Sequence, residues 1–305
     1  MASPRISSHL DERIELHRAA GKRLKAPAIL ALWHLTSLDA PTVALVWTWA
    51  FAWAVGVKLS PWILLLVAFV TWTVYACDRI LDARRATRTG DLTILRDRHY
   101  FHWRHRGKFM PIAALTGTAS ALAIFCLIPF DTRAHDSVIA AAALAYFSGV
   151  HLPVRFPTRL SVVAPKELLV GLLFTAGCAA PALSRLHWTQ AAITSLASVL
   201  ACIAFFAVLA WLNCAAIASW ESSCHRLAIQ TQAALICSIG FALGLAGSFT
   251  QIRLSSLLCA GGASALLLLV LDRSRHHLAP LLLRALADAV LLTPALLLIV
   301  GAHGW

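Results

Sequence analysis

Charged residues are scarce in this chain, and their scarcity excludes an ordinary water-soluble domain. They make up 13% of the 305 residues, whereas about a quarter of a typical soluble domain is charged. Hydrophobic residues make up 59%, and the mean hydropathy is +0.74. Because the apolar residues stand in long runs, the sequence predicts an all-α integral membrane protein.

Paired cysteines and flexible linkers are also missing. None of the eight cysteines stands in a CxxC pair, and a cysteine within an apolar run behaves as a small hydrophobe. This pattern indicates neither a disulfide framework nor a zinc site. No Gly/Ser-rich linker interrupts the chain, so we expect one transmembrane domain over residues 28–305. Residues 1–27 are expected to form a cytoplasmic or interfacial segment, and they lack the pattern of a signal peptide.

Nine apolar stretches are candidates for membrane-spanning helices. A helix needs about 20 apolar residues to cross a bilayer, and most of the nine approach or exceed that length. The sixth is long enough to extend beyond the membrane. The stretches are Ala40–Val57, Pro61–Cys77, Phe109–Phe130, Ser137–Leu152, Val163–Leu183, Trp188–Trp220, Ala228–Phe249, Leu254–Leu271 and Ala279–Val300.

Basic residues are distributed very unevenly between the two ends of these expected helices. With the N-terminus inside, 22 of the 26 lysines and arginines fall on the cytoplasmic side. Cytoplasmic loops of membrane proteins carry such an excess. The formal charge of +12 is therefore explained by membrane sidedness, and nucleic acid is not expected as a partner.

Two aspartates follow the second apolar stretch directly. Asp78 and Asp82 are four residues apart, so on a continuing helix both carboxylates lie on one face. Such a pair suits Mg²⁺, whose other ligands are commonly phosphate oxygens and water. The alternative is an Asp/Arg-rich helix end held by salt bridges at the level of the lipid headgroups.

A second polar pair ends the sixth stretch, on the same predicted side of the membrane. Asn213 and Glu221 are eight residues apart, just over two helical turns, and therefore lie on roughly the same side of a helix. Amide and carboxylate oxygens both bind hard cations. The alternative is an Asn packed between helices and an exposed Glu.

The first of these motifs resembles that of a known family. The run Asp78-Arg-Ile-Leu-Asp82, followed by Arg85, is similar to the N-D-x-x-D-x-x-x-D motif of the UbiA superfamily of intramembrane prenyltransferases. Val74 and Tyr75 stand where that family has Asn-Asp. Its second motif, D-x-x-x-D, is matched only in part at the end of the sixth stretch, so the resemblance is to a divergent member.

The resemblance implies a function and a set of site residues. It implies a UbiA-type bundle in a bilayer, which for a bacterial protein is the inner membrane, with its active site facing the cytoplasm. There Mg²⁺ and an isoprenyl diphosphate would bind, and the isoprenyl group would pass to a lipophilic acceptor. The implied metal-binding and catalytic residues are Asp78, Asp82, Asn213 and Glu221. The implied diphosphate-binding residues are Arg79, Arg85 and Lys166.

Two other functions stay open at this point. The first is a membrane terpene synthase, in which the allylic cation cyclises or is quenched without an acceptor. The second is a transporter or a non-catalytic lipid-binding protein, although transporters place broken helices and charges near the membrane midplane. The carboxylates here lie at predicted helix ends instead.

The remaining polar residues are given structural roles. Asp39, two residues before Pro41, is interpreted as a helix start. Arg284 and Asp288 are four residues apart and are expected to pair within the bundle. The stretch 98–106, with three histidines among aromatic and basic residues, is interpreted as an interfacial anchor and not as a metal site.

Overall fold

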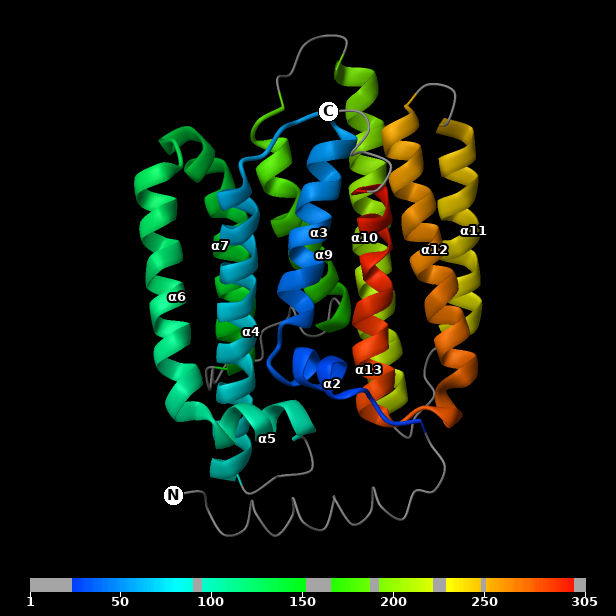
Figure 1. The fold of residues 1–305 in the computed structure, drawn as a ribbon. Coiled ribbons are helices and arrows are strands. Elements are labelled where there is room, and N and C mark those ends of the chain that lie inside the picture. The colour runs from blue at the N-terminus through cyan, green and yellow to red at the C-terminus, as the bar shows by residue number, and fades with distance from the viewer. Residues whose placement is uncertain are drawn as a thin grey trace.

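The described part of the chain is a bundle of long helices (Figure 1). The computed structural model describes residues 24–89, 95–151, 166–186, 192–221, 229–247 and 251–298, so most of the expected N-terminal segment lies outside the described residues. The helices are α2 (Ala28–Leu35), α3 (Asp39–Ala54), α4 (Pro61–Thr89), α5 (Asp97–Arg104), α6 (Arg106–Leu127), α7 (Phe130–His151), α9 (Lys166–Leu183), α10 (Ala192–Glu221), α11 (Ile229–Gly247), α12 (Ile252–Ser274) and α13 (Pro280–Ala289), with 3-10 segments η1 (Arg275–His277) and η2 (Val290–Leu296).

Six described helices are long and apolar enough to cross a membrane, and the bent pair α2–α3 raises the number to seven. The expected number of nine is therefore not confirmed, although each of the nine stretches overlaps a helix. Three of them fall short for visible reasons. Helix α3 has only 16 residues, α7 begins with a polar turn, and the last stretch is divided between α13 and η2, which contains Pro294.

The aromatic centre of the bundle lies between α3, α9 and α10. Trp47 is fully buried, and its ring meets Phe206 edge to face with centroids 4.8 Å apart. Its indole N–H donates to the Leu291 carbonyl in η2 at 2.9 Å. Large apolar side chains on α6, such as Leu115 and Phe125, are instead about 70% exposed, which suits a surface facing lipid.

Close contact between α9 and α10 depends on Gly171. A Cβ atom added at Gly171 would lie 2.7 Å from the backbone nitrogen of Trp211 and 3.0 Å from the carbonyl oxygen of Ala207. Both atoms belong to the α10 backbone and have no rotamer to change. Gly177 lies on the same helix, but a Cβ added there meets no described atom within 4 Å.

We therefore expect Gly171→Ala to destabilise the protein by about 1–3 kcal/mol, because the two helices must separate. Gly177→Ala is the matched control, and it should be neutral or stabilising by up to about 1 kcal/mol, since alanine favours the helix. Thermal unfolding of the detergent-solubilised protein measures both changes. Equal melting temperatures for the two variants would contradict the close packing of α9 and α10.

Two short helices, α2 and α5, lie across one end of the bundle (Figure 1). Helix α2 meets α3 at 84°, and the turn between them contains Ser37 with a φ of 56°. That left-handed conformation is costly for a residue other than glycine. The long helices α4 and α10 also reach this end, where they carry Asp82 and Glu221.

Candidate functional site

The acidic motif of α4 lies on a continuous helix, as the sequence predicts. Helix α4 runs unbroken to Thr89, so the carboxylates of Asp78 and Asp82 lie on one face. Both side chains keep between a quarter and a third of their surface exposed. Asp78 accepts a hydrogen bond from Arg79 at 2.7 Å, and this guanidinium also lies 5.5 Å from the ring centre of Tyr75.

Helix α5 connects this motif with the one at the end of α10. Arg96, the residue before α5, donates from Nε to Glu221 at 3.1 Å. One turn later, Nε2 of His99 lies 3.6 Å from Asp82. The Arg96 backbone N–H donates to Nδ1 of His99 at 2.9 Å, so a neutral His99 carries its proton on Nε2, facing the aspartate. The two acidic helix ends therefore meet beneath one turn of α5.

Glu221 is also in contact with a second arginine, which comes from α13. Arg284 Nε lies 2.7 Å from the Glu221 carboxylate, across from the Arg96 contact. We expected Arg284 to pair with Asp288 on the same helix, and the structure places it against Glu221 of α10. Asp288 accepts a hydrogen bond from Asn213 at 3.1 Å, so both residues of the expected pair have partners on α10.

The site carries more positive than negative charge. We name Arg79, Arg96, Arg98 and Arg284 the arginine cluster. Burial, together with the positive charges of Arg79 and Arg284, lowers the pKa of Arg98 to about 10, so it remains protonated at neutral pH. The same causes, burial first and then the arginines, hold the pKa of His99 far below its ordinary value. The crowded guanidinium groups give the site a positive charge that suits an anion.

Two donors of the arginine cluster are left without partners. The Nε atoms of Arg79 and Arg98 are buried and make no hydrogen bond to any described residue. A buried donor without an acceptor is costly. Guanidinium groups bind phosphate oxygens through pairs of N–H groups. The geometry is therefore suited to an anionic ligand with several oxygen atoms.

The structure brings some of the predicted site residues together and leaves others apart. Asp78, Asp82, Arg79 and Glu221 belong to the assembly beneath α5. Arg85 is exposed on the last turns of α4, and Lys166 is exposed at the first residue of α9. No hydrogen bond or ion pair joins Lys166 to another described residue. Asn213 is buried, and its amide faces Asp288.

Several residues of the site were not predicted from the sequence. We interpreted the stretch that contains Arg98 and His99 as an interfacial anchor. We gave Arg96 no role, and we assigned Arg284 to a local pair with Asp288. The density of arginine and histidine around residue 98 was a visible signal. The sequence could not show that these side chains face the interior, because this depends on how α5 lies across the bundle.

Known proteins do not add to these observations: no family model, curated protein or solved structure matches the chain.

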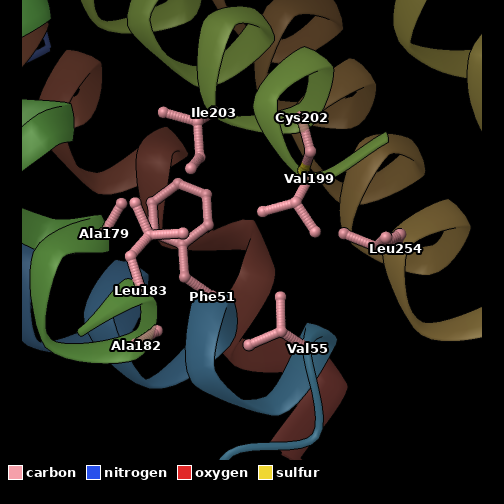
Figure 2. A pocket seen from close by; sticks show the side chains of 9 residues that line it. All are labelled: Phe51, Val55, Ala179, Ala182, Leu183, Val199, Cys202, Ile203 and Leu254. Carbon is pink, nitrogen blue, oxygen red and sulfur yellow. The ribbon is translucent and has the colours of Figure 1, made fainter. Parts of the chain in front are cut away.

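A small apolar cavity lies near the other end of the bundle (Figure 2). It is lined by Phe51, Val55, Ala179, Ala182, Leu183, Val199, Cys202, Ile203 and Leu254, from α3, α9, α10 and α12. Its volume is about 10 Å³, close to what a single water molecule needs. The cavity is too small for an isoprenyl chain and offers no polar side-chain group besides a thiol.

Proposed function

We propose that this protein transfers an isoprenyl group from an isoprenyl diphosphate to a lipophilic acceptor within the membrane, with Mg²⁺ as cofactor. One observation carries the proposal: the acidic ends of α4 and α10 meet beneath α5, surrounded by the arginine cluster. A site that joins carboxylates to an excess of guanidinium groups suits a metal–diphosphate complex, because the metal meets the carboxylates and the phosphate oxygens meet the arginines.

The residues present fit both components of that complex. Asp78 and Asp82 are partly exposed, as a hydrated Mg²⁺ that keeps several waters requires. Glu221 is an oxygen ligand already held in place by two arginines. The unpartnered Nε atoms of Arg79 and Arg98 supply donors for phosphate oxygens. Asn213 is engaged with Asp288, so we assign it a smaller part in this site than the sequence predicted.

The chemistry breaks the allylic C–O bond of the diphosphate, forms a bond between the freed allylic carbon and the acceptor, and releases a proton from the acceptor. Bound Mg²⁺ would add to the positive charge that stabilises the departing diphosphate. The arginine cluster does the same from the protein side, because its groups are already oriented when charge develops on the leaving oxygen.

The proposal also includes the fold of the protein, its orientation and the membrane in which it lies. We propose a UbiA-type bundle with a cytoplasmic N-terminus in the bacterial inner membrane, and a site that opens to the cytoplasm. The support is the position of α5, since arginine-rich segments concentrate on the cytoplasmic side. The nine-span arrangement remains part of this proposal, in which α7 and the α13–η2 segment complete the bundle although each is less apolar or less regular than the other spans.

The test uses the full chain in detergent with radiolabelled C10 to C20 isoprenyl diphosphates, with Mg²⁺ or with EDTA. Diphosphate release and labelled lipid products are followed with and without a membrane-lipid extract. We expect release that requires Mg²⁺ and rises with the extract, because the extract supplies the acceptor. The product should be a prenylated lipid.

Two other outcomes would overturn the proposal in different ways. Release that ignores the extract and yields a hydrocarbon or isoprenoid alcohol would identify a terpene synthase. Neither release nor Mg²⁺-dependent binding of any isoprenyl diphosphate would leave a non-catalytic membrane protein. Transport would then be tested by uptake into vesicles that contain the purified chain.

A further inference from the structure

A second group of metal-ligand side chains lies at the bend between α2 and α3. Nδ1 of His34, at the end of α2, lies 2.6 Å from Asp39, the first residue of α3, and 3.7 Å from Asp288 of α13. One ligand atom from each residue lies within 4.8 Å of the others. With ligand bonds of about 2.0–2.1 Å, the ligand atoms of a tetrahedral zinc site lie about 3.3–3.5 Å apart. To hold an ion, the short His34–Asp39 contact would lengthen and the wider separations would shorten.

These side chains are removed from solvent. His34 is 1% exposed and Asp39 is 6% exposed, while the side chain of Asp288 keeps 18% of its surface. Although Nδ1 of His34 is close to Asp39, neither ring nitrogen of His34 makes a contact with hydrogen-bond geometry. Nδ1 thus lies at ion-pair distance from Asp39, whereas Nε2 is buried without a partner among the described residues, which is costly at this depth.

A buried amide side chain lies beside this group. Asn213 is 5% exposed, and its nitrogen donates to Asp288 at 3.1 Å, but its Oδ1 atom is buried without a partner. Rotation of the amide by 180° exchanges nitrogen and oxygen. The oxygen would then point to the carboxylate group and be able to bind a cation held there.

The charge balance also favours a divalent cation at this place. When both aspartates are ionised and His34 is neutral, the group carries two negative charges. Uncompensated charge is costly where water is excluded. A divalent ion bound by a neutral imidazole and two carboxylates gives a net charge of zero.

We propose that His34, Asp39, Asp288 and Asn213 form a site for a divalent first-row transition-metal ion of the zinc type. Nδ1 of His34 supplies the nitrogen ligand, each aspartate supplies one oxygen, and Oδ1 of Asn213 completes a tetrahedron. Imidazole favours such ions over Mg²⁺. Apart from Asn213, which has a smaller part there, this site shares no ligand with the proposed Mg²⁺–diphosphate site, and it does not depend on it.

The site has a structural consequence for the α2–α3 bend. Its ligands come from four helices, α2, α3, α10 and α13, so a bound ion ties the short lateral helix to the bundle. The turn that it closes contains Ser37 in a left-handed conformation, which must be held by surrounding contacts. A metal ion that links the residues on either side of the turn provides such a contact.

The experiment measures metal bound by the full chain in detergent, without any diphosphate. The protein is stripped with EDTA, incubated with ZnCl₂, desalted and analysed for zinc per chain. We expect wild type to retain about one more equivalent than His34→Gln or Asp288→Asn. Asp82→Asn, whose carboxylate belongs to the other site, should retain as much zinc as wild type. Zinc should also raise the melting temperature of wild type but not of the two ligand variants.

Cobalt gives a second readout that does not depend on the stability of the variants. Co²⁺ in wild type should show the intense visible bands of a tetrahedral site. His34→Cys should keep the ion and add a thiolate-to-cobalt charge-transfer band, because the sulfur binds directly. Zinc retention equal in wild type, His34→Gln and Asp288→Asn, or Co²⁺ spectra unchanged by His34→Cys, would overturn the proposal. Failure of prenyl transfer would leave it untouched, since no substrate is involved.

Discussion

Replacement of Asp82 by Asn is expected to lower Mg²⁺-dependent diphosphate release by about 1,000-fold, a loss typical of removing one preorganised electrostatic group. Asn has the size of Asp and keeps an oxygen beside Nε2 of His99, which lies 3.6 Å from the carboxylate. It lacks the negative charge that would hold Mg²⁺ against the departing diphosphate. The rate is measured with saturating isoprenyl diphosphate so that weaker binding does not mask it.

Two matched variants separate a direct role of Asp82 from a structural one. His99→Gln removes the imidazole but keeps the carboxylate, so it should reduce release far less than Asp82→Asn. Asp131→Asn alters an exposed carboxylate at the start of α7, at the other end of the bundle, and should leave the rate unchanged. Equal losses in His99→Gln and Asp82→Asn would instead make Asp82 a support for α5.

Replacement of Glu221 by Gln should have two opposite effects, because this carboxylate is the counter-charge of two arginines. Its oxygens lie 3.1 Å from Arg96 and 2.7 Å from Arg284, and the three side chains are only 10–24% exposed. Without the charge, the arginines repel one another. We expect the free energy of unfolding to fall by about 2–3 kcal/mol. Removing one partner of a fully buried ion pair costs more, about 3–5 kcal/mol.

The second effect of Glu221→Gln concerns the ligand. Guanidinium groups released from their internal carboxylate should bind inorganic diphosphate about tenfold more tightly when Mg²⁺ is absent. The free energy of this tenfold change is only a fraction of that of one charge–charge interaction near the protein surface. Mg²⁺-dependent release should fall, because a metal ligand is lost. Calorimetric titration with diphosphate, with and without Mg²⁺, measures both changes.

Glu221→Asp keeps the charge on a shorter side chain and serves as the control. It should bind diphosphate as wild type does in the absence of Mg²⁺, even if its geometry toward the metal is poorer. Unchanged diphosphate affinity in Glu221→Gln would show that the arginine cluster does not bind the anion. Unchanged stability would show that the two ion pairs are exposed enough to contribute little.

Part of the candidate site could be predicted because it depends on one helix at a time. The four-residue spacing of Asp78 and Asp82 places both on one face of any helix that continues through them, and α4 does continue. Arg284 shows the limit of this reasoning. The sequence offered its helical neighbour Asp288 as a partner, but its ion pair with Glu221, which is distant in sequence, could not be predicted.

The number of membrane spans shows a similar limit. Apolar length predicts where a helix forms, and a helix is present at each of the nine stretches. It does not predict where a helix breaks, bends or becomes too polar to cross a bilayer. The 84° bend at Ser37 and the change from α13 to η2 depend on how these segments pack against the bundle.

That this is a helical membrane protein could be predicted from the sequence alone, because apolar length and the lack of charge are properties of the chain that need no packing. The sequence also shows which residues carry ionisable groups at the ends of α4 and α10. Other contacts could be seen only in the folded chain: Arg96, Arg98, His99 and Arg284 surround those groups, and His34 and Asp39 meet Asp288 on α13. Such contacts depend on distances between helices, and these distances are set when side chains far apart in sequence interlock.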